Sequence, residues 1–296
     1  MERSNISKLQ LISSMLIFGT IGIFVKYIPL PSDIIAMVRG AVGALFLFLL
    51  SFLRKKSIDF SLLKNKALPL LLSGSFIGIN WILLFEAYKH TTVATATLCY
   101  YLAPIFVILA SPLFLGEKLT VKKALCSLTA LVGMIFVSGV AENGIPPVSE
   151  LKGIFFGVGA AIFYATVIIL NKKNPDIPTF DRTFFQLGSA ALVLLPYSLL
   201  TGSFNHSPPE FSALLLLFAV GIIHTGIAYV LYFGSMNGLS AHTIAIMSYI
   251  DPISAIALSS LFFPDEKLTL YGTVGGILIL GATLVSEINF SNKIKS

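Results

Sequence analysis

The stretch YLAPIFVILASPLFLGEKLT, residues 101–120, decides the fold of this chain together with a second copy of itself. The copy is YIDPISAIALSSLFFPDEKLT, residues 249–269, and it begins 148 positions later, half the length of the 296-residue chain. Glu117-Lys-Leu-Thr and Glu266-Lys-Leu-Thr match one residue out of step. The sequence therefore predicts two related halves, residues 1–143 and 144–296.

The runs around these copies are too apolar for a soluble protein. Hydrophobic residues make up 56% of the chain and charged residues only 11%, against about 25% charged residues in soluble domains. Stretches of roughly 18 or more apolar residues are long enough to cross a hydrocarbon core of about 30 Å as helices, which satisfy their own backbone groups. We expect an all-α membrane protein with ten transmembrane helices, at about 9–28, 34–53, 66–89, 92–115, 120–140, 151–171, 182–201, 211–235, 239–263 and 268–287.

Basic residues between these helices predict the orientation. Fifteen Lys and Arg lie in the segments on the N-terminal side of the membrane, and three, Lys89, Lys152 and Lys267, lie on the other. Because short cytoplasmic loops collect Lys and Arg, both termini are expected in the cytoplasm of a bacterial inner (plasma) membrane protein. The net charge of +6 is then explained by the Lys and Arg of the cytoplasmic loops and does not indicate that the protein binds nucleic acid.

Five helices in each half make the two repeats inverted, because an odd number of crossings reverses the direction of entry into the membrane. Inverted repeats are the plan on which many secondary transporters alternate between inward-open and outward-open states. This pattern favours a carrier of a small polar solute.

The two motif copies also resemble those of the drug/metabolite transporter superfamily, in its ten-helix EamA branch. Arg39-Gly40 in the second helix looks like the basic position of the first repeat, whereas Leu187 stands at that position in the second. The resemblance covers nearly the whole chain and implies a proton-driven or gradient-driven carrier, often an exporter of amino acids or related metabolites. It also implies a central cavity lined by helices 1, 3, 4, 6, 8 and 9, with helices 5 and 10 at the periphery.

Asp251 is the leading candidate for function, since a charge within a membrane helix costs about 2.5–3.5 kcal/mol on insertion scales. Pro252 removes a backbone donor beside it, and broken helices near the midplane commonly hold transporter sites. Asp251 is expected to carry a proton or bind a substrate ammonium, with capping or helix pairing as the alternative. Pro104 matches Pro252 and is either a gating hinge or a packing kink.

Arg39 and Glu86 are candidates near the outer ends of helices 2 and 3. Arg39 is placed to bind a substrate carboxylate through two hydrogen bonds, or to lock an outer gate against Glu86, or to act structurally. Glu86 and Lys89 are three residues apart, so they are expected to pair on one helix face.

Further candidates supply polar tips and aromatic faces at the depth of a central cavity. His224 is either a proton relay or substrate contact or a satisfied interhelical histidine, and His242 is expected at the membrane interface. Glu117 and Glu266 are expected to cap the helices that they precede. The predicted cavity lining, with helix packing as its alternative, comprises Asn80, Trp81, Tyr101, Tyr164, His224, Tyr229, Tyr249 and Asp251.

Other functional classes find no support in the sequence. It holds no His-Glu-x-x-His zinc site, no phosphate-binding Gly-x-x-x-x-Gly-Lys-Ser/Thr loop and no usable Ser-His pair, so we expect neither an enzyme nor a cofactor or metal site. The expected partners are a small-molecule substrate and the lipid bilayer, with proton coupling open and a monomer or homodimer as the assembly. An importer of a metabolite or nucleoside, a channel and a scaffold remain alternatives.

Overall fold

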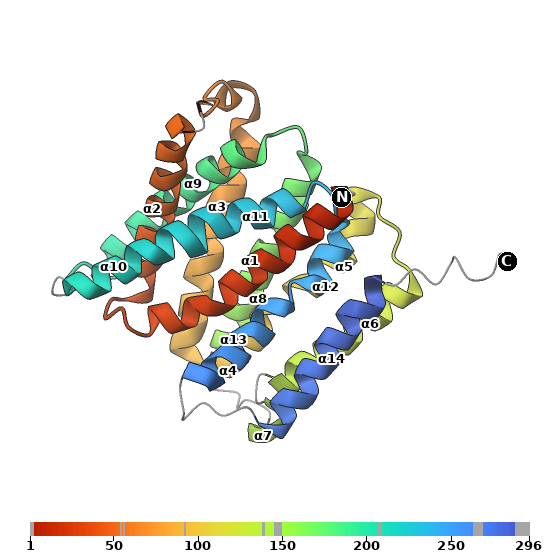
Figure 1. Cartoon of the computed structure of the whole chain (residues 1–296). Coiled ribbons are helices and arrows are strands. Elements are labelled where there is room, and N and C mark those ends of the chain that lie inside the picture. Colours follow the sequence, from red (N-terminus) through yellow and green to blue (C-terminus); the bar gives the residue numbers. More distant parts are fainter. Residues whose placement is uncertain are drawn as a thin grey trace.

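The computed structural model describes residues 3–53, 55, 57–91, 93–137, 140–144, 150–205, 209–262 and 269–287, and within these ranges its regular structure is entirely helical. Figure 1 shows the helices gathered into one bundle. The predicted all-α class is confirmed. Among the described residues, seven helical segments are long and apolar enough to cross a membrane. They are α1 (Arg3–Val25), α2 (Ser32–Leu53), α3 (Leu62–His90), α4 with α5, α8 (Leu151–Lys173), α9 (Thr179–Leu200), and the continuous run of α10 (Phe211–Ala219), η2 (Val220–Ile227) and α11 (Ala228–Ser235).

The remaining predicted spans are shorter or interrupted. They correspond to α6 (Val121–Val137), to α12 with α13, and to α14 (Leu270–Glu287). A short α7 (Val140–Asn143) follows α6. The ten-span arrangement therefore stays a prediction.

Two predicted helices, 92–115 and 239–263, are each broken in two. The first consists of α4 (Val93–Tyr100) and α5 (Ala103–Leu115), and the second of α12 (Ala241–Met247) and α13 (Ile250–Phe262). Pro104 and Pro252 lie within the first three residues of α5 and α13, where the missing proline N–H leaves no helical hydrogen bond unmade. The breaks fall at matching positions of the two sequence copies.

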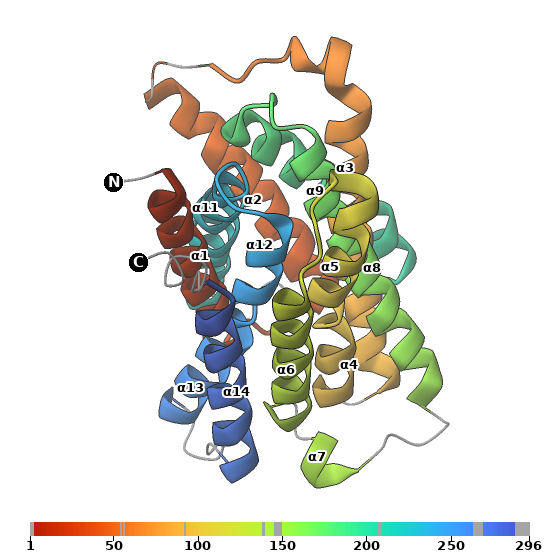
Figure 2. The same cartoon turned by 90° about the vertical axis from the view of Figure 1, so that its right-hand side faces the viewer.

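Helix packing separates a central group from one peripheral pair. The helix α3 packs against α8 and α9, α2 against α9, and α1 against α11 and α13. Gly74 and Gly78 bring α3 so close to α9 that an added Cβ would lie 2.6 to 2.9 Å from it. In contrast, α6 and α14 pack chiefly on each other, at the lower right edge of the bundle in Figure 1, the side that faces the viewer in Figure 2. The expectation that predicted helices 5 and 10 are peripheral is confirmed.

Candidate functional site

The two helix breaks meet at the centre of the bundle through the matching residues of the two motifs. The Tyr101 hydroxyl donates a hydrogen bond to Asp251 Oδ2 at 3.1 Å, and the Tyr249 hydroxyl donates one to the Tyr101 carbonyl at 3.0 Å. The two tyrosine rings lie 6.3 Å apart. The hydrogen bond from Tyr101 positions the Asp251 carboxyl group. Because the Asp251 side chain is only half-buried, it is still accessible.

A group of tyrosines, here called the tyrosine cluster, extends from this junction across α4, α8 and α11. Tyr100 lies 5.6 Å from Tyr101 and 5.6 Å from Tyr164, and Tyr164 stacks on Tyr232 at 6.3 Å between ring centroids. These offset and edge contacts suit aromatic rings. The cluster comprises Tyr100, Tyr101, Tyr164, Tyr229 and Tyr232.

Arg39 approaches the same cluster from α2. Its guanidinium carbon lies 4.1 Å from the centroid of the Trp81 ring, and Trp81 makes an edge contact with Tyr229 at 6.3 Å. Tyr100 and Tyr229 both lie within electrostatic range of Arg39 and of Asp251. Arg39 is half-buried, and its Nε has no hydrogen-bond partner among the residues that the structure describes. The tyrosine cluster therefore lies between the Arg39 guanidinium and the Asp251 carboxyl group.

Two of the predicted cavity residues make contacts between helices instead. Asn80 donates a hydrogen bond to the Ala160 carbonyl at 2.6 Å, which ties α3 to α8. The His224 ring, in η2, lies 2.8 Å from the Thr20 hydroxyl and 4.8 Å from the Phe24 ring, both on α1. The structure places His224 on the Arg39 side of the site, in electrostatic contact with Arg39.

Glu86 lies at the end of the bundle where α2 and α10 begin. Its carboxylate pairs with Lys89 at 2.7 Å, as predicted, and also accepts a short hydrogen bond from Tyr197. Glu86 is thus engaged away from Arg39, and the alternative of an Arg39–Glu86 lock is not formed. A cavity of about 630 Å³ opens at this end. Its lining comprises residues 29–33 with Phe85, Tyr88, Lys89, Tyr197, Thr201, Gly202 and Ser203.

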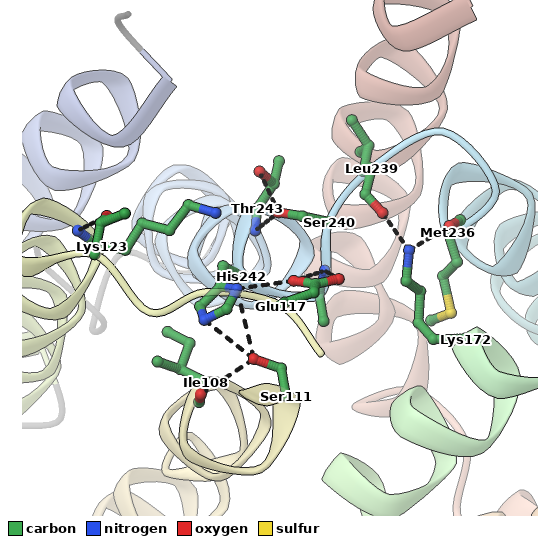
Figure 3. Close-up of polar contacts among 12 residues, drawn as sticks. Ile108, Ser111, Glu117, Lys123, Lys172, Met236, Leu239, Ser240, His242 and Thr243 are labelled. Atoms are coloured by element: carbon green, nitrogen blue, oxygen red, sulfur yellow. Dashed lines mark hydrogen bonds and ion pairs between the residues drawn. The ribbon is translucent and has the colours of Figure 1, made fainter. Parts of the chain in front are cut away.

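The opposite end, here called the basic end, carries the loops at 57–61, 116–120, 174–178 and 236–240. Glu117 accepts hydrogen bonds from the Ala241 N–H at 2.9 and 3.0 Å and faces His242 Nδ1 at 2.8 Å (Figure 3). Because a carboxylate only accepts, Nδ1 carries the proton. His242 Nε2 lies 3.0 Å from the Ser111 hydroxyl. Burial raises the pKa of Glu117, but hydrogen bonds from His242 and Ala241 and the charge of Lys172 outweigh it and hold the pKa below its usual value.

Two expectations for this end were wrong. Glu117 caps α12, 124 residues away in sequence, rather than the helix that it precedes. His242 is fully buried rather than interfacial, because Glu117 and Ser111 satisfy both of its ring nitrogens. Glu266 lies outside the described residues.

Two cations of this end also do more than the sequence indicated, since both were counted only as loop charges. Lys172 donates to the Met236 and Leu239 carbonyls at 3.1 and 2.5 Å, just beyond α11 (Figure 3). Arg182 is 1% exposed and donates to the Asn171 carbonyl at 2.9 Å. Cations at helix C-termini are favourable. The only signal in the sequence was that both residues adjoin apolar runs.

Comparisons with known proteins give one consistent answer. The model of the EamA-like transporter family matches residues 6–139 and again residues 151–287. An uncharacterised transporter of Bacillus subtilis, YxxF, is 31% identical, covering 99% of this chain and 93% of its own length. The pseudopaline exporter CntI of Pseudomonas aeruginosa is 26% identical over 86% of both chains.

More distant similarity extends to animals and to a solved structure. Solute carrier family 35 member G1 of the mouse is 27% identical over 75% of this chain and 63% of its own length. One crystal structure superposes with a TM-score of 0.82, covering 95% of this chain and 97% of that chain. Its identity of 21% supports the fold alone.

Proposed function

Because this chain belongs to the EamA-like transporter family and is a multi-pass membrane protein, we propose that it is a secondary transporter that exports a small zwitterionic metabolite, such as an amino acid. In this proposal ten helices in two inverted repeats cross the bacterial inner membrane, and the basic end faces the cytoplasm. The family and its named relatives are transporters rather than enzymes. Among the relatives, the pseudopaline exporter supports the outward direction.

The observation that carries this proposal is the shared lining between Arg39 and Asp251. A substrate carboxylate is suited to the guanidinium fork of Arg39, and a substrate ammonium to the Asp251 carboxylate. The tyrosine cluster between them offers ring faces to an apolar side chain and attracts cations. Binding by both charges explains why half-buried charges are retained within helices where each is costly.

Transport by alternating access requires that the two ends of the site open in turn. The cavity of about 630 Å³ lies at the end opposite the basic end, and ligand sites commonly have volumes of about 300–1,000 Å³. At the basic end, Glu117 and His242 close the space around α12. The structure is accordingly interpreted as a state whose outer side is the more open one.

The ligand class is tested with three probes that share a phenyl ring: L-phenylalanine, phenethylamine and 3-phenylpropionate. Binding to the purified protein is measured from the rise in melting temperature. We expect the zwitterion to bind roughly tenfold or more tightly than either singly charged probe, because each charged hydrogen bond contributes about 1.5–3 kcal/mol. In Asp251→Asn, L-phenylalanine should no longer bind more tightly than 3-phenylpropionate, which lacks the ammonium. In Arg39→Gln, it should no longer bind more tightly than phenethylamine, which lacks the carboxylate.

Glu210→Gln is the control, because Glu210 is exposed at the start of α10. The proposed ligand class is wrong if no probe raises the melting temperature, or if all variants rank the probes alike. In proteoliposomes, a bound probe should show saturable flux and exchange, whereas linear flux would indicate a channel. Flux driven by a pH gradient should be lost in Asp251→Asn, and its persistence would remove Asp251 from proton coupling.

A further inference from the structure

The structure assigns a gate at the basic end, formed by Ser111, Glu117, Lys172 and His242 and here called the inner latch, that is coupled to the Asp251 site through the short helix α12. The assignment rests on the proposed function, because a gate has meaning only in a protein that alternates between two open states. Neither the motif nor the family match assigns a role to these residues.

The inner latch joins three segments that must separate if the basic end opens. Ser111 comes from α5, Glu117 from the loop that follows it, and His242 from the first turn of α12. Lys172 of α8 completes the group, lying in electrostatic range of Glu117. Lys172 also binds the Met236 and Leu239 carbonyls, so it holds the loop that leads into α12.

The side chains of the inner latch are enclosed rather than spread on the surface. The His242 side chain is fully buried and that of Glu117 is 19% exposed. Removing one partner of such a pair leaves the other buried without its hydrogen bonds, which costs free energy. Partly separated partners carry the same cost, so the latch has one closed state and one open state rather than a series of intermediates. A buried hydrogen-bonded pair such as Glu117 and His242 holds one conformation and, once broken, releases it.

The helix α12 connects the inner latch to the central site. It has seven residues, about 10 Å at 1.5 Å per residue, and begins at the latch. It ends at the break beside Tyr249, whose hydroxyl holds the Tyr101 carbonyl next to Asp251. The helix α12 is attached at both ends, and the break at its far end separates it from α13. Because it is not continuous with α13, α12 is able to move as one rigid piece. A change at Asp251 is thereby transmitted to Glu117 and His242.

The test measures access from each face of the membrane and needs no substrate. A Ser248→Cys reporter is placed at the far end of α12 in a background with Cys99→Ala and Cys126→Ala. A membrane-impermeant maleimide is applied to right-side-out and inside-out vesicles. We expect Glu117→Gln to raise the labelling rate from the cytoplasmic face about tenfold. Losing a charged hydrogen bond should increase the population of the state that is open at the basic end by about that factor. Labelling from the outer face should stay equal or fall.

The matched control is Glu150→Gln, which removes a carboxylate beside the start of α4 at the other end of the bundle. It should leave cytoplasmic labelling unchanged. His242→Gln is a second latch variant, expected to act in the same direction if Glu117→Gln folds poorly. Labelling that is unchanged from both faces in both latch variants overturns the proposal, and so does a rise from both faces, which would indicate a loosened fold. A rise confined to the outer face would support the latch but reverse the proposed orientation.

Discussion

The short helices α4 and α12 occupy matching positions of the two sequence copies, yet they are held at their starting ends in different ways. Beside α4, the Thr91 hydroxyl donates a hydrogen bond to Glu150, at the start of α8. At α12, Glu117 binds the first amide and the buried His242, which in turn contacts Ser111. Equivalent sequence has produced equivalent breaks but unequal anchors. In the proposed transport cycle, that inequality corresponds to one closed end and one open end.

The central residues differ between the two copies in a similar way. Ala103 stands in the first copy where Asp251 stands in the second, so only one break carries a charge. The tyrosines of the two motifs are correspondingly unequal: Tyr101 binds the Asp251 carboxylate, whereas Tyr249 binds a neutral carbonyl. The two motif copies thus differ in charge at the position next to the helix that leads to the inner latch.

The largest expected effect separates the two anchors. Glu117→Gln should lower the free energy of unfolding in detergent by about 3 kcal/mol, because it breaks charged hydrogen bonds to a buried histidine and an amide. Glu150→Gln should cost about 1 kcal/mol, since the hydrogen bond between Thr91 and Glu150 joins partly exposed groups. Chemical denaturation of both variants measures the difference. Equal losses would show that the two anchors are energetically alike.

A smaller effect distinguishes the two tyrosines. Tyr101→Phe should cost about 2 kcal/mol and Tyr249→Phe about 1 kcal/mol, since a hydrogen bond to a carboxylate contributes more than one to a carbonyl. Both substitutions keep the ring and remove only the hydroxyl. The same denaturation experiment compares them, and the reverse order would mean that Asp251 is not held by Tyr101 as a charged acceptor.

The smallest effect is expected in acid. Since the pKa of Glu117 is lowered on folding, the stabilisation from its charge is present above the usual value of 4.5 and is lost as pH falls below it. The stability difference between the native protein and Glu117→Gln should therefore be constant near neutral pH and become smaller as the pH falls below 4.5. Melting temperatures measured from pH 7 to pH 3.5 test this. A stability difference that does not narrow at all between pH 7 and pH 3.5 would mean that hydrogen-bond shape, not charge, stabilises the anchor.

Much of the framework was predictable because it depends on local sequence. Hydropathy over about 20 residues identifies an apolar helix wherever it lies, and the all-helical class followed from it. The Glu86–Lys89 pair was predictable from a spacing of three residues on one helix. Prolines at positions 104 and 252 indicated weakened helices, although continuous helices were expected where the structure has breaks.

The partners of the charged residues were not predictable in this way. Glu117 and Ala241 are separated by 124 residues, and Tyr101 and Asp251 by 150. A helix-start position suggested that Glu117 caps its own helix, since a carboxylate favours any helix N-terminus within reach. Tertiary packing brought the start of α12 within that reach instead.

By itself, then, the sequence determined a helical membrane protein, its family and two helices weakened by proline, because hydropathy, proline geometry and motif spacing act between neighbouring residues. Only the tertiary structure decided which charges meet. It placed Arg39 and Asp251 on one tyrosine cluster, buried His242 against Glu117 and opened the cavity at the end opposite them. These contacts depend on how helices from both halves pack. A polar side chain forms a hydrogen bond with the donor or acceptor that helix packing places within about 3 Å of it.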